Sequence, residues 1–496
     1  MTDVLTDTRS RIITTDPQDI AVVGGGMAGM LAALVLARDG HTVTVYERDD
    51  TDLPETADEA FEMWDRRGAA HARQSHALLA RLRRFLRERA PDVLEALLEQ
   101  GATELSIERI LPPDITDREP RPGDEDLVVL CCRRLTIEWV LRRAVTAEPT
   151  ITWRGGVGVA GLIADGTDIR GLRLEDGTAV TADLVVAAGG RNAMVMDWIA
   201  ELADVAPPLE ERTEAGIVYL SRFYRLRDGQ ELPVLTKTGS GGDLGYLAFS
   251  GFYGDNRTFS ITFGVPTVDR ELMGLRDEAA WEAAIRTLSP LEPWTADGLA
   301  DPISGVESMA RLHNRIRRFV VDGAPVATGL VVIGDALTAT NPWYGKGCSL
   351  AGIAAEALSD ALLAHGRDRT AVAHAMDHAV RTELEPHFDL SCRQDADRIK
   401  LHTARHEGTE PDAMAVATHD FIMNGLLPAT RVDADVFRAF FRSFNMLDDP
   451  SQLFADPKVL AAVGAAHATQ HERPPLPDLG PPRDELLAVI SAATAS

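Results

Sequence analysis

Three glycines near the amino terminus have the spacing of a dinucleotide-binding turn. Gly24, Gly26 and Gly29 fit the pattern G-x-G-x-x-G, and Glu47 follows about twenty residues later. The first glycine permits a tight turn, the second lets a diphosphate approach the backbone, and the third lets helix and strand pack closely. A carboxylate at position 47 binds ribose hydroxyls and repels a 2′-phosphate. These residue types therefore favour FAD or NAD over NADP at this turn.

The elements around the glycines have the patterns that such a turn needs. Residues 20–23 form an apolar run typical of a buried parallel strand, and residues 27–39 predict a helix that ends at Gly40. Residues 42–46 predict a second strand that ends at the acidic residue. Gly156, Gly158 and Gly161 repeat the glycine spacing, but no apolar strand precedes them. We interpret that second match as chance.

Composition limits the class of protein. The chain has 496 residues, 45% of them hydrophobic and 25% charged, and this length predicts two or three substructures. A formal net charge of −26 argues against nucleic acid or an anionic membrane surface as a partner. The four cysteines contain no C-x-x-C, so neither a redox dithiol nor a metal site is expected. So few thiols in a long chain predict a location in the reducing cytoplasm. The polar start resembles no signal peptide, and no membrane span is predicted.

The rest of the chain divides into segments with different sequence patterns. Residues 49–65 are acidic and predict a mobile loop, followed by helices over 76–89, 91–100 and 135–147. Asp-Gly pairs separate three short strands between 157 and 181, and an apolar strand runs from 184 to 188. Residues 216–263 alternate as in a sheet with one packed face. Tyr246, Phe252 and Tyr253 are either core residues there or part of a substrate cavity. Helices dominate after 350, and 474–482 is a Pro-rich strap.

These patterns predict an α/β fold with four segments. A Rossmann-type FAD-binding domain with a parallel sheet and a β-meander insertion takes residues 18–205 and returns over 326–400. A mixed β-sheet domain for the substrate takes 206–325, and a helical C-terminal region takes 401–496.

A second nucleotide-like signal lies about 300 residues after the first. An apolar strand over 330–333 ends in Gly334 and Asp335, a loop with Pro342, Gly345 and Gly347 follows, and a helix over 350–364 comes next. Trp343 and Tyr344 either shape a pocket or are packed loop aromatics. The basic cluster over 66–73 is either a solvated helix entry or holds one arginine that reaches cofactor phosphates.

The ordered set of motifs resembles the FAD-dependent monooxygenases of the para-hydroxybenzoate hydroxylase fold, the class A flavoprotein monooxygenases. The set is the glycine turn, an arginine before the next helix, a meander, a mid-chain strand into Gly-Arg, and a late Gly-Asp before Pro-x-x-Gly-x-Gly. The likeness spans residues 18–400. Within the class, residues 23–31 and 67–76 resemble actinobacterial enzymes that include polyene epoxidases of polyether biosynthesis.

The resemblance implies roles residue by residue. The glycine turn would hold the FAD diphosphate, Glu47 the adenosine ribose, Arg73 and Arg134 the phosphate and ribityl region, and Asp335 a ribityl hydroxyl. The loop at 342–347 would pass beside the isoalloxazine ring, with the following helix dipole stabilising reduced flavin. The full expected FAD-binding set is Gly24, Gly26, Met27, Ala28, Gly29, Glu47, Arg48, Arg73, Arg134, Gly334, Asp335, Pro342, Gly345, Lys346 and Gly347.

The resemblance also implies an activity. NAD(P)H would reduce the flavin, O₂ would form a flavin C4a-hydroperoxide, and one oxygen atom would hydroxylate or epoxidise a small hydrophobic organic substrate of secondary metabolism, with polyene epoxidation as the narrower hypothesis. Hydride would come from a transient nicotinamide site or from a separate flavin reductase. No catalytic acid or base is assigned, and we interpret His71 and His76 as structural or phosphate-side residues.

The sequence departs from the family pattern at two places, and rival functions remain. Residues 187–191 lack the acidic residue of the usual Asp-Gly motif, and His71 replaces a usual glutamine. The W-x-W-x-I-P motif of tryptophan halogenases is absent from the sequence. The rivals are a flavin-dependent reductase of the geranylgeranyl reductase type, a halogenase, and a non-catalytic flavin-binding or redox-sensing protein.

Overall fold

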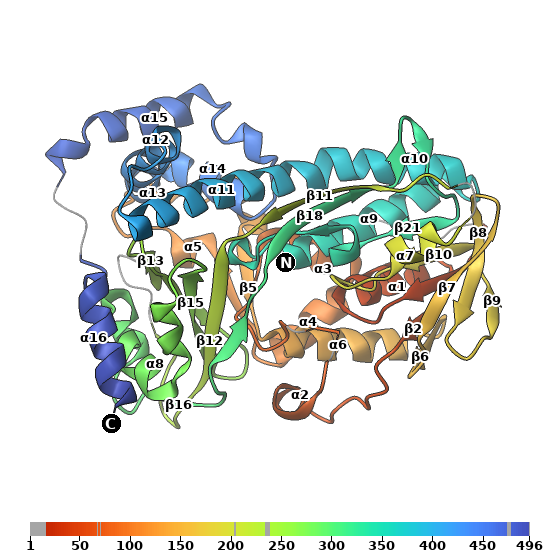
Figure 1. The fold of residues 1–496 in the computed structure, drawn as a ribbon, viewed down its shortest axis with the longest axis horizontal. Coiled ribbons are helices and arrows are strands. Elements are labelled where there is room, and N and C mark those ends of the chain that lie inside the picture. The colour runs from red at the N-terminus through yellow and green to blue at the C-terminus, as the bar shows by residue number, and fades with distance from the viewer. Residues whose placement is uncertain are drawn as a thin grey trace, which may run out of the picture.

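The computed structural model describes residues 16–66, 68–69, 71–202, 205–233, 239–473 and 478–495. A nucleotide-binding layer, a second sheet and a group of C-terminal helices make up the fold (Figure 1). The polar amino terminus before Asp16, Arg67 of the basic cluster, and residues 474–477 of the expected strap lie outside the described residues.

Five parallel strands form the sheet of the nucleotide-binding layer. Their order is β21 (Leu330–Val332), β10 (Leu184–Ala187), β1 (Asp19–Val23), β2 (Thr42–Glu47) and β6 (Ile151–Gly155). The central strands are apolar along their length because both faces of a parallel sheet are covered. Helices α1 (Met27–Arg38), α9 (Gly347–His365) and α6 (Arg134–Ala147) lie together in this layer. The meander β7 (Val159–Asp165), β8 (Asp168–Leu174) and β9 (Ala179–Thr181) packs beside β10.

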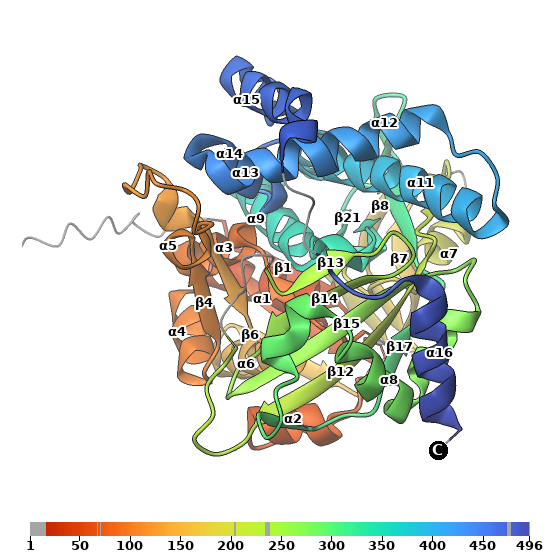
Figure 2. The same cartoon turned by 90° about the vertical axis from the view of Figure 1, so that its left-hand side faces the viewer.

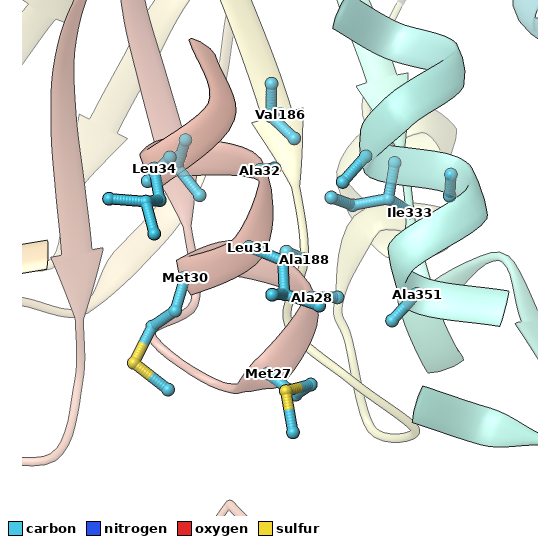
Figure 3. Close-up of a cluster of buried hydrophobic side chains, with 14 of the residues drawn as sticks. Met27, Ala28, Met30, Leu31, Ala32, Leu34, Val186, Ala188, Ile333 and Ala351 are labelled. Atoms are coloured by element: carbon cyan, nitrogen blue, oxygen red, sulfur yellow. The ribbon is translucent and has the colours of Figure 1, made fainter. Parts of the chain in front are cut away.

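Small residues let α1 approach both the sheet and α9. A Cβ at Gly29 would lie 1.9 Å from the carbonyl oxygen of Gly24, and a Cβ at Gly334 would lie 2.5 Å from the Cβ of Ala28. Figure 3 shows Ala28 of α1 beside Ala188, on the side of α1 that faces α9 and its Ala351. Helix α9 is long and apolar enough to cross a membrane, but 67% of that apolar stretch is buried inside the protein. This degree of burial is typical of a core helix.

The central strands of the second sheet are buried on both faces, so the single packed face that the alternating pattern predicted is wrong: Ser260 and Thr262 are 3% and 5% exposed. Its strands are β13 (Gly241–Asp243), β14 (Ala248–Tyr253), β15 (Thr258–Pro266), β12 (Ile217–Leu226) and β16 (Ala300–Pro302), and β17 (Glu307–Met309) pairs with β12. Phe259, Ile261 and Phe263 are fully buried on one face, where Phe263 meets Trp281 of α8 (Glu278–Ile285) at 4.6 Å between ring centroids. Helix α16 (Arg483–Thr494) packs against α8 (Figure 2).

Two small sheets join the layers. One contains β11 (Leu209–Glu214), β18 (His313–Arg318) and β22 (Thr338–Ala339), and the other contains β3 (Ala77–Leu78), β5 (Val128–Cys131) and β4 (Thr103–Ser106). A short hairpin pairs β19 (Val320–Val321) with β20 (Ala324–Pro325). The helices between them are α3 (Ala80–Arg89), α4 (Pro91–Glu99), α5 (Ile107–Ile110) and α7 (Val195–Ala200).

The C-terminal third is helical, and its longest helix crosses the molecule. Helix α10 (Arg369–Ala379) continues through a π-helical segment (Val380–Leu384) into α11 (Glu385–Glu407), which lies over β11 and β18 (Figure 1). The remaining helices are α12 (Ala413–Phe421), α13 (Leu427–Val432), α14 (Ala434–Phe444) and α15 (Pro457–Ala468), with a second π-helical segment at Ile422–Leu426.

Two sequence predictions of local structure were wrong. The expected loop over 49–65 contains α2 (Ala57–Met63), which begins with a capping box between Thr56 and Glu59. The helix expected from 76 begins only at Ala80, because Ala77 and Leu78 pair with β5 instead. In the second case strand pairing outweighs the helical spacing of the leucines.

A buried ion network connects the nucleotide-binding layer to the second sheet. The Arg133 backbone N–H donates to Asp255 Oδ1 at 2.7 Å, and its guanidinium donates to Asp255 Oδ2 at 2.6 Å and to Asp58 of α2 at 2.6 Å. Arg225 of β12 also donates to Asp58 at 2.7 Å. Burial alone would raise the pKa of Asp58, but the two arginines outweigh burial and lower this pKa to about 2.

Removing the central carboxylate should destabilise the fold strongly. In an Asp255→Ala variant the Arg133 guanidinium stays buried without its main partner, so we expect the free energy of unfolding to fall by about 3–5 kcal/mol. Urea denaturation followed by circular dichroism measures this. Asp297 serves as the control, because its 95% exposed side chain pairs with Arg286 on the surface and its loss should leave the urea midpoint unchanged. Equal midpoints for Asp255→Ala and wild type would contradict the assigned role.

Candidate functional site

The glycine turn has the geometry that the sequence predicted. Gly24 has a φ of +105°, and its N–H donates to the Tyr46 carbonyl at 2.9 Å. No atom lies within 4 Å of a Cβ built at Gly26, so the backbone there is open to a ligand. Helix α1 has no side-chain cap, and its first internal bond runs from the Met30 N–H to the Gly26 carbonyl. The N–H groups of Met27, Ala28 and Gly29 therefore have no partner within the helix.

The acidic end of β2 lies against this turn. One carboxylate oxygen of Glu47 accepts from the Gly25 N–H at 2.7 Å, and the other accepts from the Asp49 N–H at 3.0 Å. Arg48 is exposed and lines an open cavity of about 490 Å³ together with Asp49, Asp50 and Thr51. Space for an adenosine thus lies beside Glu47. The ribose contact expected of Glu47 stays a prediction.

The arginines expected near the phosphates are placed differently from one another. Arg73 donates to the carbonyls of Phe61 and Glu62 at 3.0 and 3.2 Å, at the end of α2. Among the described members of this cluster, Arg66 reaches the glycine turn: it is buried and donates to the Gly25 carbonyl at 3.1 Å. A contact between one arginine of the cluster and the cofactor phosphates stays a prediction.

A buried carboxylate joins the two arginine positions. Glu138 of α6 lies 3.2 Å from Arg66 Nε and accepts from Arg134 Nε at 2.6 Å. Burial alone would raise the pKa of Glu138, but Arg134 and Arg66 lower this pKa to about 2. Arg134 also donates to Cys348 Sγ at 2.7 Å, at the start of α9. Arg134 therefore connects the glycine-turn side of the site to the late loop.

The late Gly-Asp motif forms the other half of the site. Gly334 (φ +62°) begins a 3₁₀ turn, Gly334–Ala336, which contacts α1 and α9. The Asp335 carboxylate lies 3.7 Å from Arg191 Nε and within electrostatic range of His71 and Arg134. Residues of the first and second motifs are thus brought together, as the order of motifs predicted.

The two histidines are neutral at physiological pH. Burial and the charge of Arg134 lower the pKa of His71 to about 4 and the pKa of His76 to about 3. The His76 ring nitrogen Nδ1 lies 2.8 Å from the Gln74 carbonyl, which makes it the donor to that oxygen. Neither ring is a strong base, in agreement with their interpretation as structural or phosphate-side residues.

The loop before α9 is exposed to a ligand at one end and anchored at the other. A Cβ at Gly347 would have no atom within 4 Å, and α9 has no side-chain cap. The Lys346 side chain points away from this opening, donating to Ser391 Oγ at 3.0 Å and the His387 carbonyl at 3.3 Å on α11. Burial lowers the pKa of Lys346 to about 8. Any contact of Lys346 with FAD would therefore come from its backbone.

Sequence reasoning missed the residue that fixes this loop. Asp395 of α11 is fully buried and accepts from the side-chain amides of Asn341 and Asn314 at 2.7 Å each and from Arg398 at 2.6 Å. Asn314 also accepts from the Asn341 backbone N–H at 2.7 Å. We call Asn314, Asn341, Asp395 and Arg398 the loop anchor. No local pattern indicates it, because Asn314 and Asn341 lie far in sequence from Asp395 and Arg398 of α11.

The two aromatic pocket candidates, Trp343 and Tyr344, lie in different surroundings. Trp343 stacks on Tyr219 of β12 with centroids 5.7 Å apart, and it contacts Gly264 of β15. The Tyr344 hydroxyl instead donates to Asp395 at 3.3 Å, so Tyr344 belongs beside the loop anchor. Trp343 lies on the polar face of the second sheet, where Ser221, Thr262, Ser75 and Ser260 form a chain of hydrogen bonds of 2.6 to 2.7 Å. Tyr253 is core, because its ring stacks on Trp294.

These features fit FAD. Two uncapped helices, α1 and α9, start at open glycines 26 and 347, and Asp335 lies in the turn that contacts both helices. Helix N-termini favour negative charge, which suits a diphosphate at one end and reduced flavin at the other. In the described part of the chain, no three His, Cys, Asp or Glu side chains gather as they would around a metal ion.

Together the parallel sheet, the meander and the two-part site define the fold of FAD-dependent monooxygenases. Residues 22–52 match the NAD(P)-binding Rossmann-like domain family. The chain is 27% identical to Protein Rv3254 of Mycobacterium tuberculosis, over 87% of this chain and 90% of that protein. It is 25% identical to 6-methylpretetramide 4-monooxygenase of Streptomyces rimosus, over 78% of this chain and 85% of that enzyme.

Solved structures show the same fold. PqsL, a probable FAD-dependent monooxygenase from Pseudomonas aeruginosa, has a TM-score of 0.54 at 18% identity, covering 81% of this chain and 99% of that one. OxyS anhydrotetracycline hydroxylase from Streptomyces rimosus has a TM-score of 0.55 at 16% identity, covering 87% and 76%. The predicted likeness and fold class are confirmed. The comparisons also agree with the predicted enzyme class and with FAD and NAD(P)H as its cofactors.

Two glycine substitutions should separate cofactor binding from folding. A methyl group at Gly26 meets no protein atom, so Gly26→Ala should keep the melting temperature of the FAD-free wild type but lower the amount of FAD retained after purification. A methyl group at Gly29 would collide with the Gly24 carbonyl, so Gly29→Ala should lower the melting temperature itself. Flavin absorbance relative to protein and a thermal melt of each variant measure both effects. Full FAD retention in Gly26→Ala would remove Gly26 from the binding set.

Proposed function

We propose that this protein is an FAD-dependent monooxygenase that hydroxylates a small hydrophobic organic substrate, with NAD(P)H as electron donor. The observation that carries the proposal is the pair of uncapped helix N-termini at Gly26 and Gly347, with Asp335 in the turn that contacts both helices. We assign the cofactor-binding set predicted from the sequence to this site and add Arg66. The assignment of 206–325 as the substrate domain and of 18–205 with 326–400 as the FAD domain belongs to the same proposal.

We place the substrate beside Trp343 and Tyr219, whose arrangement suits a flat, partly polar molecule. Trp343 and Tyr219 are nearly parallel, with an interplanar angle of 7°, and they lie beside the serine and threonine hydroxyls of β12 and β15. Two proteins similar to this chain are named for oxidations of pretetramide and anhydrotetracycline compounds. We therefore propose a polycyclic aromatic substrate and hydroxylation. Polyene epoxidation remains the narrower alternative suggested by the sequence.

FAD, when bound and reduced, activates O₂ and supplies the oxygen atom. The protein residues hold and shield the reacting groups. The N-terminus of α9 stabilises negative charge beside Gly347, and the packed pair Trp343 and Tyr219 excludes water between the loop and the sheet. His71 and His76 are weak bases because burial and the charge of Arg134 lower their pKa values, so we assign neither of them as the group that removes a substrate proton.

The other readings of the sequence predict different products. A reductase of the geranylgeranyl reductase type would consume reduced cofactor without incorporating oxygen, and a halogenase would incorporate chloride or bromide. A redox sensor would not turn over. Delivery of hydride by a separate flavin reductase stays open, and four free cysteines support a reducing cytoplasm as the location.

Isotopic oxygen tests the proposed reaction. Enzyme reduced with dithionite and then given ¹⁸O₂ should transfer one labelled atom to a phenolic polycyclic substrate from a test panel, detected as a 2-dalton difference between product masses under ¹⁸O₂ and ¹⁶O₂. Because no nicotinamide is needed, the result is independent of how electrons normally arrive. A product that lacks the label, or that contains a halide, would exclude monooxygenation.

The loop anchor should control how much oxygen reaches the substrate. An Asp395→Asn variant leaves Arg398 buried without its carboxylate and loosens Asn341, so Trp343 should shield the site less well. We expect more hydrogen peroxide per NAD(P)H consumed, while FAD retention changes little. Peroxide and product are measured side by side. Asp389→Asn, a change in the same helix at a residue outside the anchor, should behave as wild type, and an unchanged peroxide yield in Asp395→Asn would refute the link.

A further inference from the structure

One buried histidine of α11 has no place in the site described so far. His402 lies seven residues after Asp395 of the loop anchor, and it is only 9% exposed. Within the part of the chain that the structure describes, its ring makes no hydrogen bond. Its nitrogen atoms are not fully enclosed, so they border space that solvent reaches. Buried polar groups in native folds are usually paired, and an unpaired imidazole at such a place points to a ligand.

The charges around His402 keep its ring neutral. Burial lowers the pKa of His402 to about 4. Asp243 acts in the opposite direction, and three other neighbours lower this pKa further: Arg398, Arg405 and His419. At pH 7 the imidazole therefore has one nitrogen that donates and one that accepts a hydrogen bond. This ring suits a hydroxyl group, whereas the exposed carboxylate of Asp243 disfavours an anionic group beside it.

The second sheet is covered only in part on the face that carries Trp343. The residues of β12 and β15 on this face are buried. On the next strand, β14, Ser250 and Phe252 point to the same face but are half-buried, and Asp243 of β13 is exposed. We call Asp243, Ser250 and Phe252 the open strip. The Ser250 hydroxyl makes only a weak contact of 3.4 Å with the Gly251 carbonyl, so it is available to a ligand.

A row of residues across the strands connects the aromatic pair to the open strip. Antiparallel pairing places Tyr219, Gly264, Ala248 and Asp243 side by side on one face. Trp343 lies over Gly264, where its ring comes within 3.2 Å of a Cβ built there. Neither Gly264 nor Ala248 carries a side chain larger than a methyl group. Two strand spacings, about 10 Å, separate Gly264 from Asp243.

Helix α11 runs along this row. Ile399 contacts Gly216 just before β12, and Arg405 contacts Gly245 in the turn between β13 and β14. Figures 1 and 2 show the C-terminal end of α11 beside β13. Seven residues of an α-helix rise about 10 Å. His402 is therefore about as far from the carboxylate of the loop anchor as the open strip is from the aromatic pair.

We propose that His402 binds a hydroxyl group at the far end of a polycyclic phenol, an inference that rests on the proposed function and narrows its substrate class. The ring to be oxidised lies beside Trp343 and Tyr219, and the rest of the molecule extends over the open strip. The phenolic O–H then donates to the neutral imidazole. A single aromatic ring is too short to occupy both ends. His402 determines specificity in this arrangement and does not touch the reacting atoms.

Ligand binding to the FAD-loaded protein at pH 7 tests this role without turnover. Pyrene and 1-hydroxypyrene share one flat ring system and differ by a hydroxyl group, and their fluorescence reports binding. Wild type should bind 1-hydroxypyrene about tenfold more tightly than pyrene, the contribution of one hydrogen bond. His402→Leu should abolish this preference by weakening only the hydroxylated ligand. In wild type, 1-methoxypyrene should bind like pyrene, because it has the oxygen atom but no proton to donate.

His406→Leu is the matched control, because His406 lies one turn further along α11 and is exposed. It should keep the wild-type preference. The proposal is overturned if wild type binds none of the three ligands, if it does not distinguish 1-hydroxypyrene from pyrene or from 1-methoxypyrene, or if His402→Leu keeps the preference. Equal weakening of all ligands in His402→Leu would show a structural role only and overturn it too. The ¹⁸O₂ result with dithionite-reduced enzyme does not depend on this preference, so the two proposals fail separately.

Discussion

The close contact between the start of α1 and the glycine turn is the constraint on which the site depends. At Gly29 the helix backbone comes so near the Gly24 carbonyl that a single methyl group has no space. This contact sets the direction of α1 and keeps its first N–H groups open. Ala28 repeats the arrangement against Gly334, which brings the second motif within reach of the first. Small residues at these two contacts therefore place both halves of the site.

Arginines are buried near the proposed cofactor groups, although the chain as a whole is acidic. The surface carries the acidic excess, whereas Arg66, Arg134 and Arg315 are buried near the proposed cofactor groups. Arg66 and Arg134 share the carboxylate of Glu138, and Arg315 has no such partner. Burying a guanidinium is costly unless anions or hydrogen bonds compensate it. Arg66 and Arg134 are thus compensated by a carboxylate, whereas Arg315 donates to the backbone carbonyls of Arg191 and Asp335.

What the sequence predicted well was local or ordered along the chain. The roles of Gly24, Gly26 and Gly29 follow from steric rules for a strand, a turn and a helix, and the pairing with Asp335 followed from motif order. Helix α2 was missed although Thr56 and Glu59 give a readable capping box. The choice of Arg66 over Arg73 depends on the path of the segment between α2 and β3, which no periodicity determines. Asp395 contacts residues 54 and 81 positions away, and only the tertiary fold makes it their neighbour.

Through the loop anchor, the C-terminal region takes part in shaping the site and is not merely an appended domain. Asp395 of helix α11 accepts a hydrogen bond from Asn341, which precedes Pro342. The conformation of the loop before α9 therefore depends on two distant parts of the chain. In evolution, Asn314, Asn341 and Asp395 would have to be inherited or replaced as a set. A chimaera that exchanges the C-terminal helices with those of a relative would therefore alter the flavin side of the protein without changing a residue that touches the cofactor.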